Sequence, residues 1–269
     1  MFEEPYRWVE AVGNRRYYLD EQFKQGSPVI ALSFSDGILL LTVSKGTPKL
    51  YEIYDRIALG GMGHPADLEK LRFNLLEMAH LEGFNRSPSD VTGARLMKYG
   101  LAPAIKQAFE EVYKAPFIVK ILLAELGSRA ERDVFLTINY DGAFEEAARF
   151  AVLAAAPAIQ ADMATHLTSR IDGSSDLPRA IDVALETWAI ASMAQQVEAD
   201  AAEHDERKTA SERADPAHPD RQAIDQHVRQ TLTDKNVECA VLERNAAGSS
   251  KYRVITPEEL RRLLPQTLR

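Results

Sequence analysis

Lys49 is the residue of this sequence whose surroundings most suggest chemistry. It opens the segment 49–57, which lies between the apolar segment 26–40 and the glycine-rich segment 57–63. An ammonium group with glycines nearby can bind a carboxylate, because glycine lets backbone N–H donors approach a ligand closely. The spacing by itself favours a simpler interpretation, in which Lys49 is a solvated lysine at the start of a strand and the glycines form turns.

Other residue types that could do chemistry do not occur in the patterns that such chemistry needs. The six histidines show no metal-ligand spacing, so we expect no metal site and no cofactor. The run 60–63 is not followed by the Gly-Lys-Ser/Thr of a phosphate-binding loop. Cys239 is the only cysteine, which excludes an intramolecular disulfide and a cysteine-cluster zinc site.

The composition indicates an ordinary globular protein. The chain has 269 residues, of which 45% are hydrophobic, and this is enough to bury one sizeable core. A net charge of −8 disfavours nucleic acid as a partner, since phosphate binding needs clustered Lys and Arg. No apolar run approaches the ~20 residues that span a membrane, and residues 1–8 lack the features of a signal peptide. We therefore expect a cytoplasmic protein without membrane contact.

The first half of the chain predicts a helix, four strands and two further helices. Apolar residues at helical spacing predict a helix over 9–25, ending at Gly26. Short apolar runs separated by turn residues then predict antiparallel strands at 29–34, 37–43, 50–54 and 56–60. Pro65 is expected to open one helix and Ser87-Pro88 the next, and Pro103 should bend or interrupt that second helix.

The second half repeats this order. The runs 117–126, 134–139 and 148–154 predict strands, and two helices should begin near Pro157 and near Asp176. The segment 195–221 is too polar to form a core and reads as a solvated helix end that leads into a mobile loop. Strands at 237–242 and 251–255 and a helix capped by Thr256 close the chain. The order suggests antiparallel sheets stacked between layers of helices.

Several short motifs occur in an order that resembles one known family. They are Asp-Val-Thr-Gly at 90–93, Thr-Ile-Asn-Tyr-Asp-Gly at 137–142, Ala-Val-Leu at 240–242 and Tyr-Arg-Val-Ile-Thr at 252–256. The chain resembles the proteasome-type N-terminal-nucleophile hydrolase fold and, within it, the bacterial-type 20S proteasome α-subunits. The resemblance implies an α+β fold, a four-layer αββα sandwich of two antiparallel sheets between helix layers. It divides the chain into an N-terminal gate segment and capping helix (1–26), the αββα core (27–195), a polar, partly mobile insertion (196–235), and C-terminal strands and a helix that complete the core (236–269).

The same resemblance argues against catalysis. Catalytic members of the fold use an N-terminal threonine freed by self-cleavage, together with an aspartate and a lysine. The matching positions here are Ser27, Val43 and Lys49, so only the lysine is present. We therefore expect no catalytic residues, no cleavage before Ser27, and a helix over 9–25 that occupies the face where a catalytic subunit opens its cleft. The chain would be a structural and gating subunit of a threonine-protease complex. The alternative is an active hydrolase with Ser27 as nucleophile after self-cleavage.

The resemblance also implies two functional elements. In α-subunits, a lysine at the place of Lys49 lies between neighbouring ring subunits and pairs with the C-terminal carboxylate of an activator's tail. Gly26 and Gly63 would line this site, with His64 adjacent; we call these four residues the tail site. The N-terminal residues would close the entry pore at the ring axis, which assigns a gate role to Phe2, Pro5, Tyr6 and Trp8. The Tyr-Asp-Arg triplet of archaeal-type gates is absent, and a frayed terminus is the alternative.

The implied partners are other protein subunits. The chain would form a homo-oligomeric ring, expected to be a heptamer, that stacks on β-type proteasome subunits. A ring ATPase or another activator would dock through its C-terminal tail. The helix over 9–25 and the helix that begins at Pro65 are the expected contact elements. A stand-alone scaffold, which forms rings without a β partner, is the second alternative.

Overall fold

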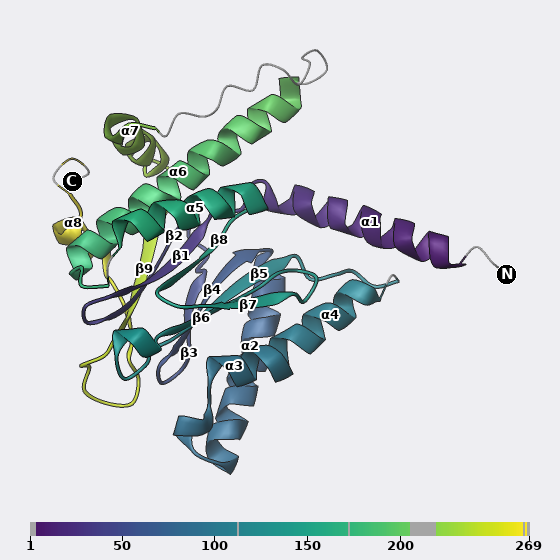
Figure 1. Cartoon of the computed structure of the whole chain (residues 1–269), viewed down its shortest axis with the longest axis horizontal. Helices are drawn as coiled ribbons and strands as arrows, with labels where there is room; N and C mark the ends of the chain where they lie inside the picture. Colours follow the sequence, from purple (N-terminus) through teal and green to yellow (C-terminus); the bar gives the residue numbers. More distant parts are fainter. Residues whose placement is uncertain (1–3, 112, 172, 205–218, 266, 268–269) are drawn as a thin grey trace.

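Two five-stranded antiparallel sheets form the centre of the protein, as the computed structural model shows for residues 4–111, 113–171, 173–204, 219–265 and 267 (Figure 1). The first sheet has the order β10-β9-β2-β1-β8 and the second the order β3-β4-β5-β6-β7. The strands of the first sheet are β1 (Val29–Phe34), β2 (Gly37–Ser44), β8 (Phe150–Leu153), β9 (Asn236–Glu243) and β10 (Tyr252–Val254). Those of the second are β3 (Leu50–Tyr54), β4 (Ile57–Gly63), β5 (Val119–Glu125), β6 (Val134–Ile138) and β7 (Phe144–Ala147).

Helices cover the outer face of each sheet. On the first sheet lie α5 (Pro157–Arg170), α6 (Leu177–His204), α7 (Arg221–Thr231) and α8 (Pro257–Leu263), and on the second α2 (Pro65–Asn85), α3 (Gly93–Arg95) and α4 (Ala102–Glu110). Alternation along the strands supplies three apolar layers. In β1, Ile30 and Leu32 face the helices, whereas Val29 and Ala31 face the other sheet. The predicted α+β class and the four-layer αββα order are confirmed.

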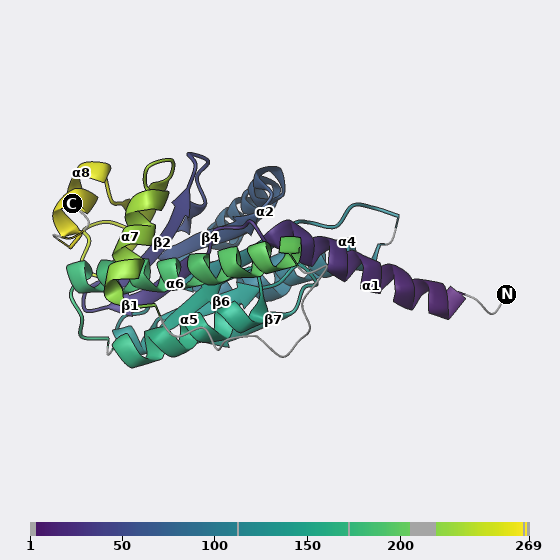
Figure 2. The ribbon, with the colours of Figure 1, turned by 90° about the horizontal axis from the view of Figure 1, so that it is seen from above.

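The N-terminal helix α1 (Glu4–Phe23) belongs to neither layer. Figures 1 and 2 show that it leaves the sandwich at one edge and that its N-terminal end lies farthest from the body. Its last turns enter the layer between the sheets, where Leu19 and Phe23 are fully buried. The helix therefore has an anchored C-terminal part and a projecting N-terminal part.

The helix that was expected to start at Ser87 begins later. Ser87 caps only a 3₁₀ turn (Pro88–Asp90), because Val91 is extended; the regular helix starts at Gly93, where the Thr92 hydroxyl accepts from the Arg95 N–H. Residues Leu96–Leu101 then form a π-helix, in which the Ala102 N–H donates to the Met97 carbonyl. This wider turn comes directly before Pro103, whose ring would clash with the fourth preceding carbonyl in a regular α-helix. The expected interruption at Pro103 thus takes the form of a π-helix.

Three other elements differ from the expectation. β4 continues to Gly63 instead of Gly60, β7 was not predicted, and α6 extends to His204. Within the segment 196–235, α7 also was not predicted. It packs Ile224 and Val228 into the same apolar cluster as the buried side chains of α6. The residues between these two apolar positions are polar, although Asp225 and His227 are also buried, so they lower the mean hydropathy of the segment and hide its amphipathic helix. Residues 205–218 lie outside the described residues, and the domain boundaries stay a prediction.

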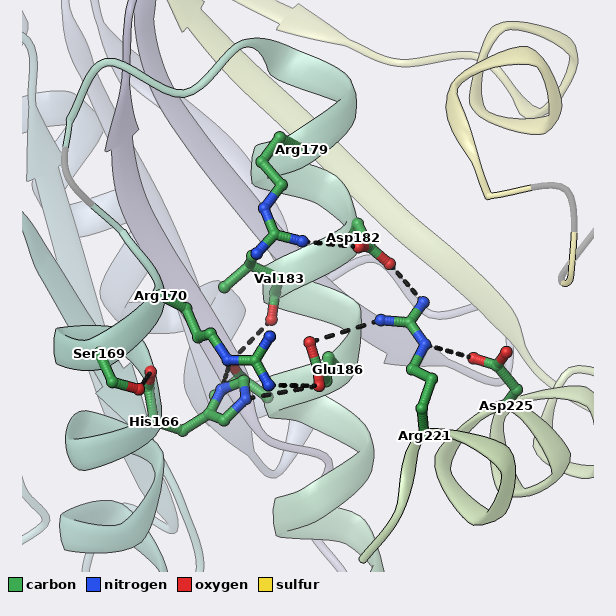
Figure 3. Close-up of polar contacts among 10 residues, drawn as sticks. His166, Ser169, Arg170, Arg179, Asp182, Val183, Glu186, Arg221 and Asp225 are labelled. Atoms are coloured by element: carbon green, nitrogen blue, oxygen red, sulfur yellow. Dashed lines mark hydrogen bonds and ion pairs between the residues drawn. The ribbon is translucent and has the colours of Figure 1, made fainter.

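A cluster of charged side chains joins α5, α6 and α7 (Figure 3). The Arg221 guanidinium contacts three carboxylates, at 2.6 Å from Asp182, 3.4 Å from Glu186 and 3.0 Å from Asp225. Glu186 is buried and also pairs with Arg170 at 3.5 Å, and His166 Nε2 lies 3.7 Å from its carboxylate. The arrangement connects α7 to the helices beneath it, since each carboxylate needs its cations to remain charged out of water.

Glu186 should make the stability of the protein depend on pH. His166, with Arg170 and Arg221, holds the pKa of Glu186 below its ordinary value against the opposing effect of burial. A carboxylate whose folded pKa is lowered stabilises the fold above its unfolded pKa of about 4.3, and this contribution is lost as the pH falls through the folded pKa. Urea unfolding of Glu186→Gln should show a loss of about 1–3 kcal/mol at pH 7 and a smaller loss below pH 4. The exposed Asp162→Asn should differ from wild type by less than about 0.5 kcal/mol. A Glu186→Gln loss that does not change with pH would contradict this role.

Candidate functional site

Lys49 lies just before β3, where the two sheets approach each other. Its carbonyl accepts a hydrogen bond from the Gly61 N–H at 2.9 Å. Its own N–H donates to both carboxylate oxygens of Glu238, at 2.9 and 3.0 Å, and the Leu50 N–H donates to the same carboxylate at 2.7 Å. Glu238 lies in β9 of the other sheet, so this carboxylate connects the start of β3 to the first sheet.

The charges around Lys49 oppose one another. The side chain is half-buried, and burial lowers the pKa of its ammonium, while the charge of Glu238 raises this pKa and that of Lys235 lowers it. Burial likewise raises the pKa of Glu238, whereas the two backbone N–H bonds and Lys49 lower it. The ammonium and the carboxylate together leave little net charge at this point of the surface.

The structure brings the four residues of the tail site to the same end of the sandwich. Gly63 is the last residue of β4 and His64 follows it, two and three positions beyond the Gly61 that bonds Lys49. Gly26 is adjacent to β4, since a Cβ added to it would lie 2.3 Å from the Met62 methyl group. The predicted site is thus compact, and its role in binding stays a prediction.

Each of these residues also has a structural reason to be present. Gly63 has a φ of +129°, and a Cβ there would lie 2.0 Å from the Ile118 carbonyl oxygen, so no other residue fits. His64 is the N-cap of α2, and its Nδ1 accepts from the Ala66 N–H at 3.3 Å. The Gly26 carbonyl accepts from the Gln195 side chain at 3.1 Å. The interpretation in which the glycines serve turns and close packing therefore has direct support.

The residues assigned to a gate lie at the projecting end of α1. Trp8 is 50% exposed, which leaves its ring free for a contact outside the chain. Pro5 and Tyr6 lie in the first turn of α1, but their side chains, and all of Phe2, lie outside the described residues. The assignment of these residues to a gate stays a prediction.

Arg15 fixes the direction in which α1 projects. Its guanidinium donates to four backbone carbonyls at the end of α4 and just beyond it, those of Ala108, Phe109, Glu111 and Lys114, at 2.6 to 3.1 Å. The last carbonyls of a helix lack partners within it, and a cation there also faces the negative end of the helix dipole. Arg15 therefore supplies hydrogen-bond donors to the carbonyls at the end of α4 and attaches α1 to that helix.

The last turns of α1 close the edge of the sandwich. The Phe23 ring stacks on Tyr140 with centroids 5.9 Å apart, and the Lys120 ammonium lies 4.9 Å from the Phe23 centroid. The Tyr140 hydroxyl donates to Asp20 at 2.7 Å. The predicted helix over 9–25 thus occupies the edge of the layer between the sheets.

Ser27, the candidate nucleophile, is engaged by structural contacts. Its hydroxyl accepts from the Trp188 indole N–H at 2.9 Å and lies 3.5 Å from the Thr42 hydroxyl. Neither partner can take up a proton as a general base. Val43 packs in the apolar layer under α6, so the aspartate position holds a buried aliphatic side chain. These contacts show how Ser27 is held without supplying the chemistry of a nucleophile.

Sequence reasoning missed Glu238, Arg15 and Lys120, whose roles depend on contacts between distant segments. Glu238 and Lys120 left a local signal, because each interrupts an apolar run, at 237–242 and at 117–126, with a charge. Arg15 is one of several cations on α1, and nothing near it in the sequence indicates that it meets residues 108–114.

The described part of the chain has neither a helix suited to a membrane nor a cluster of metal-ligating side chains. Of its helices, none has the length and apolar character needed to cross a membrane. Nor does this part bring together three His, Cys, Asp or Glu side chains in a group that could hold a metal ion.

Comparison with known proteins gave consistent matches. No family model matches the chain. It is 31% identical to the proteasome subunit alpha of Actinosynnema mirum over 142 residues, which are 52% of this chain and 53% of the relative. It is 32% identical to that of a Nocardioides species over 168 residues, 60% and 62% of the two chains. The match thus spans little more than half the length of these first relatives. A third match, to the proteasome subunit alpha of Streptomyces avermitilis, is 27% identical over 259 residues and covers 95% of this chain and 87% of the relative.

The attachment of α1 by Arg15 can be tested by hydrogen exchange. Arg15→Ala removes the donor to four carbonyls, so the amides of residues 13–23 should exchange at least about tenfold faster, because each lost bond contributes about 1 kcal/mol. Tyr17→Ala serves as the control, since its side chain is 70% exposed on the same helix and should leave that exchange unchanged. Equal protection from exchange in wild type and Arg15→Ala would show that the apolar contacts of Leu19 and Phe23 hold α1 without the hydrogen bonds of Arg15.

Proposed function

We propose that this chain, which is 27 to 32% identical to the three proteasome α subunits named above over the matched residues, is a bacterial-type α subunit and forms the non-catalytic outer ring of a 20S-like proteasome. In this proposal the ring is a homo-oligomer, a heptamer, which stacks on β-type subunits, admits substrates through a gated pore and docks an activator by its C-terminal tails. The complex would act in the cytoplasm. The single observation that carries the proposal is the match to a proteasome subunit alpha over 95% of the chain.

The contacts of Ser27 support a non-catalytic role. A nucleophile of this fold needs a free N-terminus and a nearby base. Here the Ser27 hydroxyl accepts from the Trp188 indole N–H, and α1 fills the adjacent edge of the sandwich. The alternative of an active Ser27 hydrolase would require α1 to leave its place between the sheets.

Exposed apolar side chains support a role for α1 and α2 in assembly. Trp8, Val9 and Tyr17 are at least half exposed on α1, and Phe73, Leu81 and Phe84 are exposed on α2. Large exposed apolar side chains gathered on a helix typically mark contact surfaces. A ring needs two different surfaces on each subunit that meet their counterparts on the neighbours, and these two helices supply candidates for them.

The position of Lys49 supports tail docking. Lys49 is half-buried, and its carbonyl accepts from Gly61 of β4, the strand that ends at Gly63 just before α2. A terminal carboxylate binds well to an ammonium with backbone N–H donors nearby. Removing the charge should therefore weaken docking without affecting the ring.

Lys49→Ala is the test of docking. In an assembled complex with the β-type partner, this change should abolish the stimulation of proteolysis by the activator, and native mass should stay that of wild type. Lys45→Ala is the matched control, because Lys45 is exposed in the same β2–β3 connection. Loss of the ring in Lys49→Ala would show that the lysine is structural, and full stimulation would exclude it from docking.

Gating can be tested by removing the residues assigned to it. Deletion of residues 2–8 should raise the hydrolysis of an unfolded protein substrate by the α/β complex several-fold, because the pore would lose its closing segment while Arg15 still attaches α1. Short peptides should be hydrolysed at a rate that changes less. If protein and peptide hydrolysis both stay at the wild-type rate, these residues do not close the pore.

A further inference from the structure

Glu238 holds the backbone donors of the tail site. Its carboxylate accepts from the Lys49 and Leu50 N–H groups at 2.7 to 3.0 Å, and these bonds cross from one sheet to the other. Backbone N–H groups beside an ammonium are what a ligand carboxylate needs. In this chain the Lys49 and Leu50 N–H groups already donate to the carboxylate of Glu238.

Glu238 also changes the charge that a ligand would meet. Burial lowers the pKa of the Lys49 ammonium, and the nearby negative charge of Glu238 raises it, as expected for an opposite charge close by. An incoming carboxylate would be attracted by Lys49 and repelled by Glu238. Both residues are part-buried, where water screens such forces less than at an open surface.

We propose that Glu238 is the specificity-determining residue of the tail site, an internal carboxylate that competes with the docking carboxylate for Lys49 and its neighbouring N–H donors. The inference rests on the proposed docking function. It implies that one tail binds weakly, so that stable docking needs several tails of one activator to bind the ring together. A single free carboxylate, such as a peptide end, would then occupy the site only at the high peptide concentrations of a titration.

Hydrogen bonds from the start of β3 keep Glu238 in place. Its carboxylate accepts from the Lys49 and Leu50 N–H groups, and Leu50 is the first residue of β3. Burial raises the pKa of Glu238, while these two bonds, Lys49 and Ser44 lower it and so favour the charged carboxylate. The two backbone donors fix the position of Glu238, which makes it a fixed competitor.

Glu238→Gln separates the charge from the hydrogen bonds. Oε1 of Glu238 accepts from both N–H groups, at 2.9 and 2.7 Å, so the single amide oxygen of glutamine can keep both bonds. The change removes the negative charge beside Lys49 and leaves the connection between the sheets. We therefore expect the variant to fold and to assemble as wild type does.

The test measures how tightly a single tail binds. The probe is an N-terminally labelled alanine heptapeptide with a free C-terminal carboxylate, followed by fluorescence anisotropy on the assembled ring. The same peptide with a C-terminal amide is the control ligand. Relative to wild type, Glu238→Gln should bind the carboxylate peptide about three- to tenfold more tightly and the amide peptide equally, while Lys49→Ala should bind the carboxylate peptide several-fold more weakly.

The outcomes distinguish the two proposals. If Lys49→Ala loses binding but Glu238→Gln does not gain it, docking at Lys49 stands and the competition by Glu238 is overturned. If Lys49→Ala binds as wild type does, or if no protein binds the carboxylate peptide, docking at Lys49 is overturned and the competition with it. Equal gains for the carboxylate and amide peptides would also overturn the competition, because the effect would then not depend on charge.

A second measurement covers the case in which Glu238→Gln fails to assemble. In a His64→Gln protein, which removes the histidine of the site, the carboxylate peptide should bind at least about twofold more tightly at pH 4.5 than at pH 7.5, because a carboxyl whose pKa lies above its ordinary value is mostly protonated at the lower pH. Protonation of Glu238 would remove the competing charge, and burial already raises the pKa of this group. Binding that does not change over this range would overturn the proposal.

Discussion

The closure of one edge of the sandwich by Phe23 is the contact on which the rest of the structure depends. The ring is fully buried between the sheets, stacked on Tyr140 and faced by the Lys120 ammonium. Lys120 is itself buried, and it remains satisfied because it donates to the carbonyls of Ala154 and Ala155 at 2.9 and 3.0 Å. Desolvation lowers the pKa of Lys120, so these acceptors and the aromatic face are needed to keep its charge inside the protein. With Phe23 in place, the last turns of α1 close this edge, and the rest of the helix projects from it in a fixed direction.

This closure lies between the two regions for which functions are proposed, the projecting end of α1 and the tail site. Toward the N-terminus, Arg15 continues the attachment of α1 and sets where Trp8 lies. Toward the C-terminus, the chain enters β1 through Ser27, whose hydroxyl bonds Trp188 of α6 and joins the edge to the outer helix layer. At the same end of the sandwich, Glu238 connects the sheets beside Lys49. This edge of the fold thus holds a helix, and in the proposed function it would shape a surface for other subunits.

Local signals predicted most of the fold, and contacts between distant segments account for what was missed. The helix start at Thr256 was predicted because a hydroxyl cap leaves a clear pattern, and the Thr256 side chain does accept from the Glu259 N–H. The similar pattern at Ser87 failed, since Val91 is extended and Thr92 makes the effective cap. Lys49 was identified through a family resemblance, but its partner Glu238 lies 189 residues away, and only the folded sheets bring them together. The residues of the tail site therefore stay a prediction, and the carboxylate beside Lys49 could not be predicted from the sequence.

The measurement that tests the central claim most directly is native mass spectrometry of the chain co-expressed with a β-type proteasome subunit. The account predicts heptameric rings stacked with the partner, and every copy of this chain retains residues 1–26, because α1 is a built part of the sandwich edge. A subunit truncated to begin at Ser27 would contradict it, since the closing helix would then be a removable segment and the chain an enzyme.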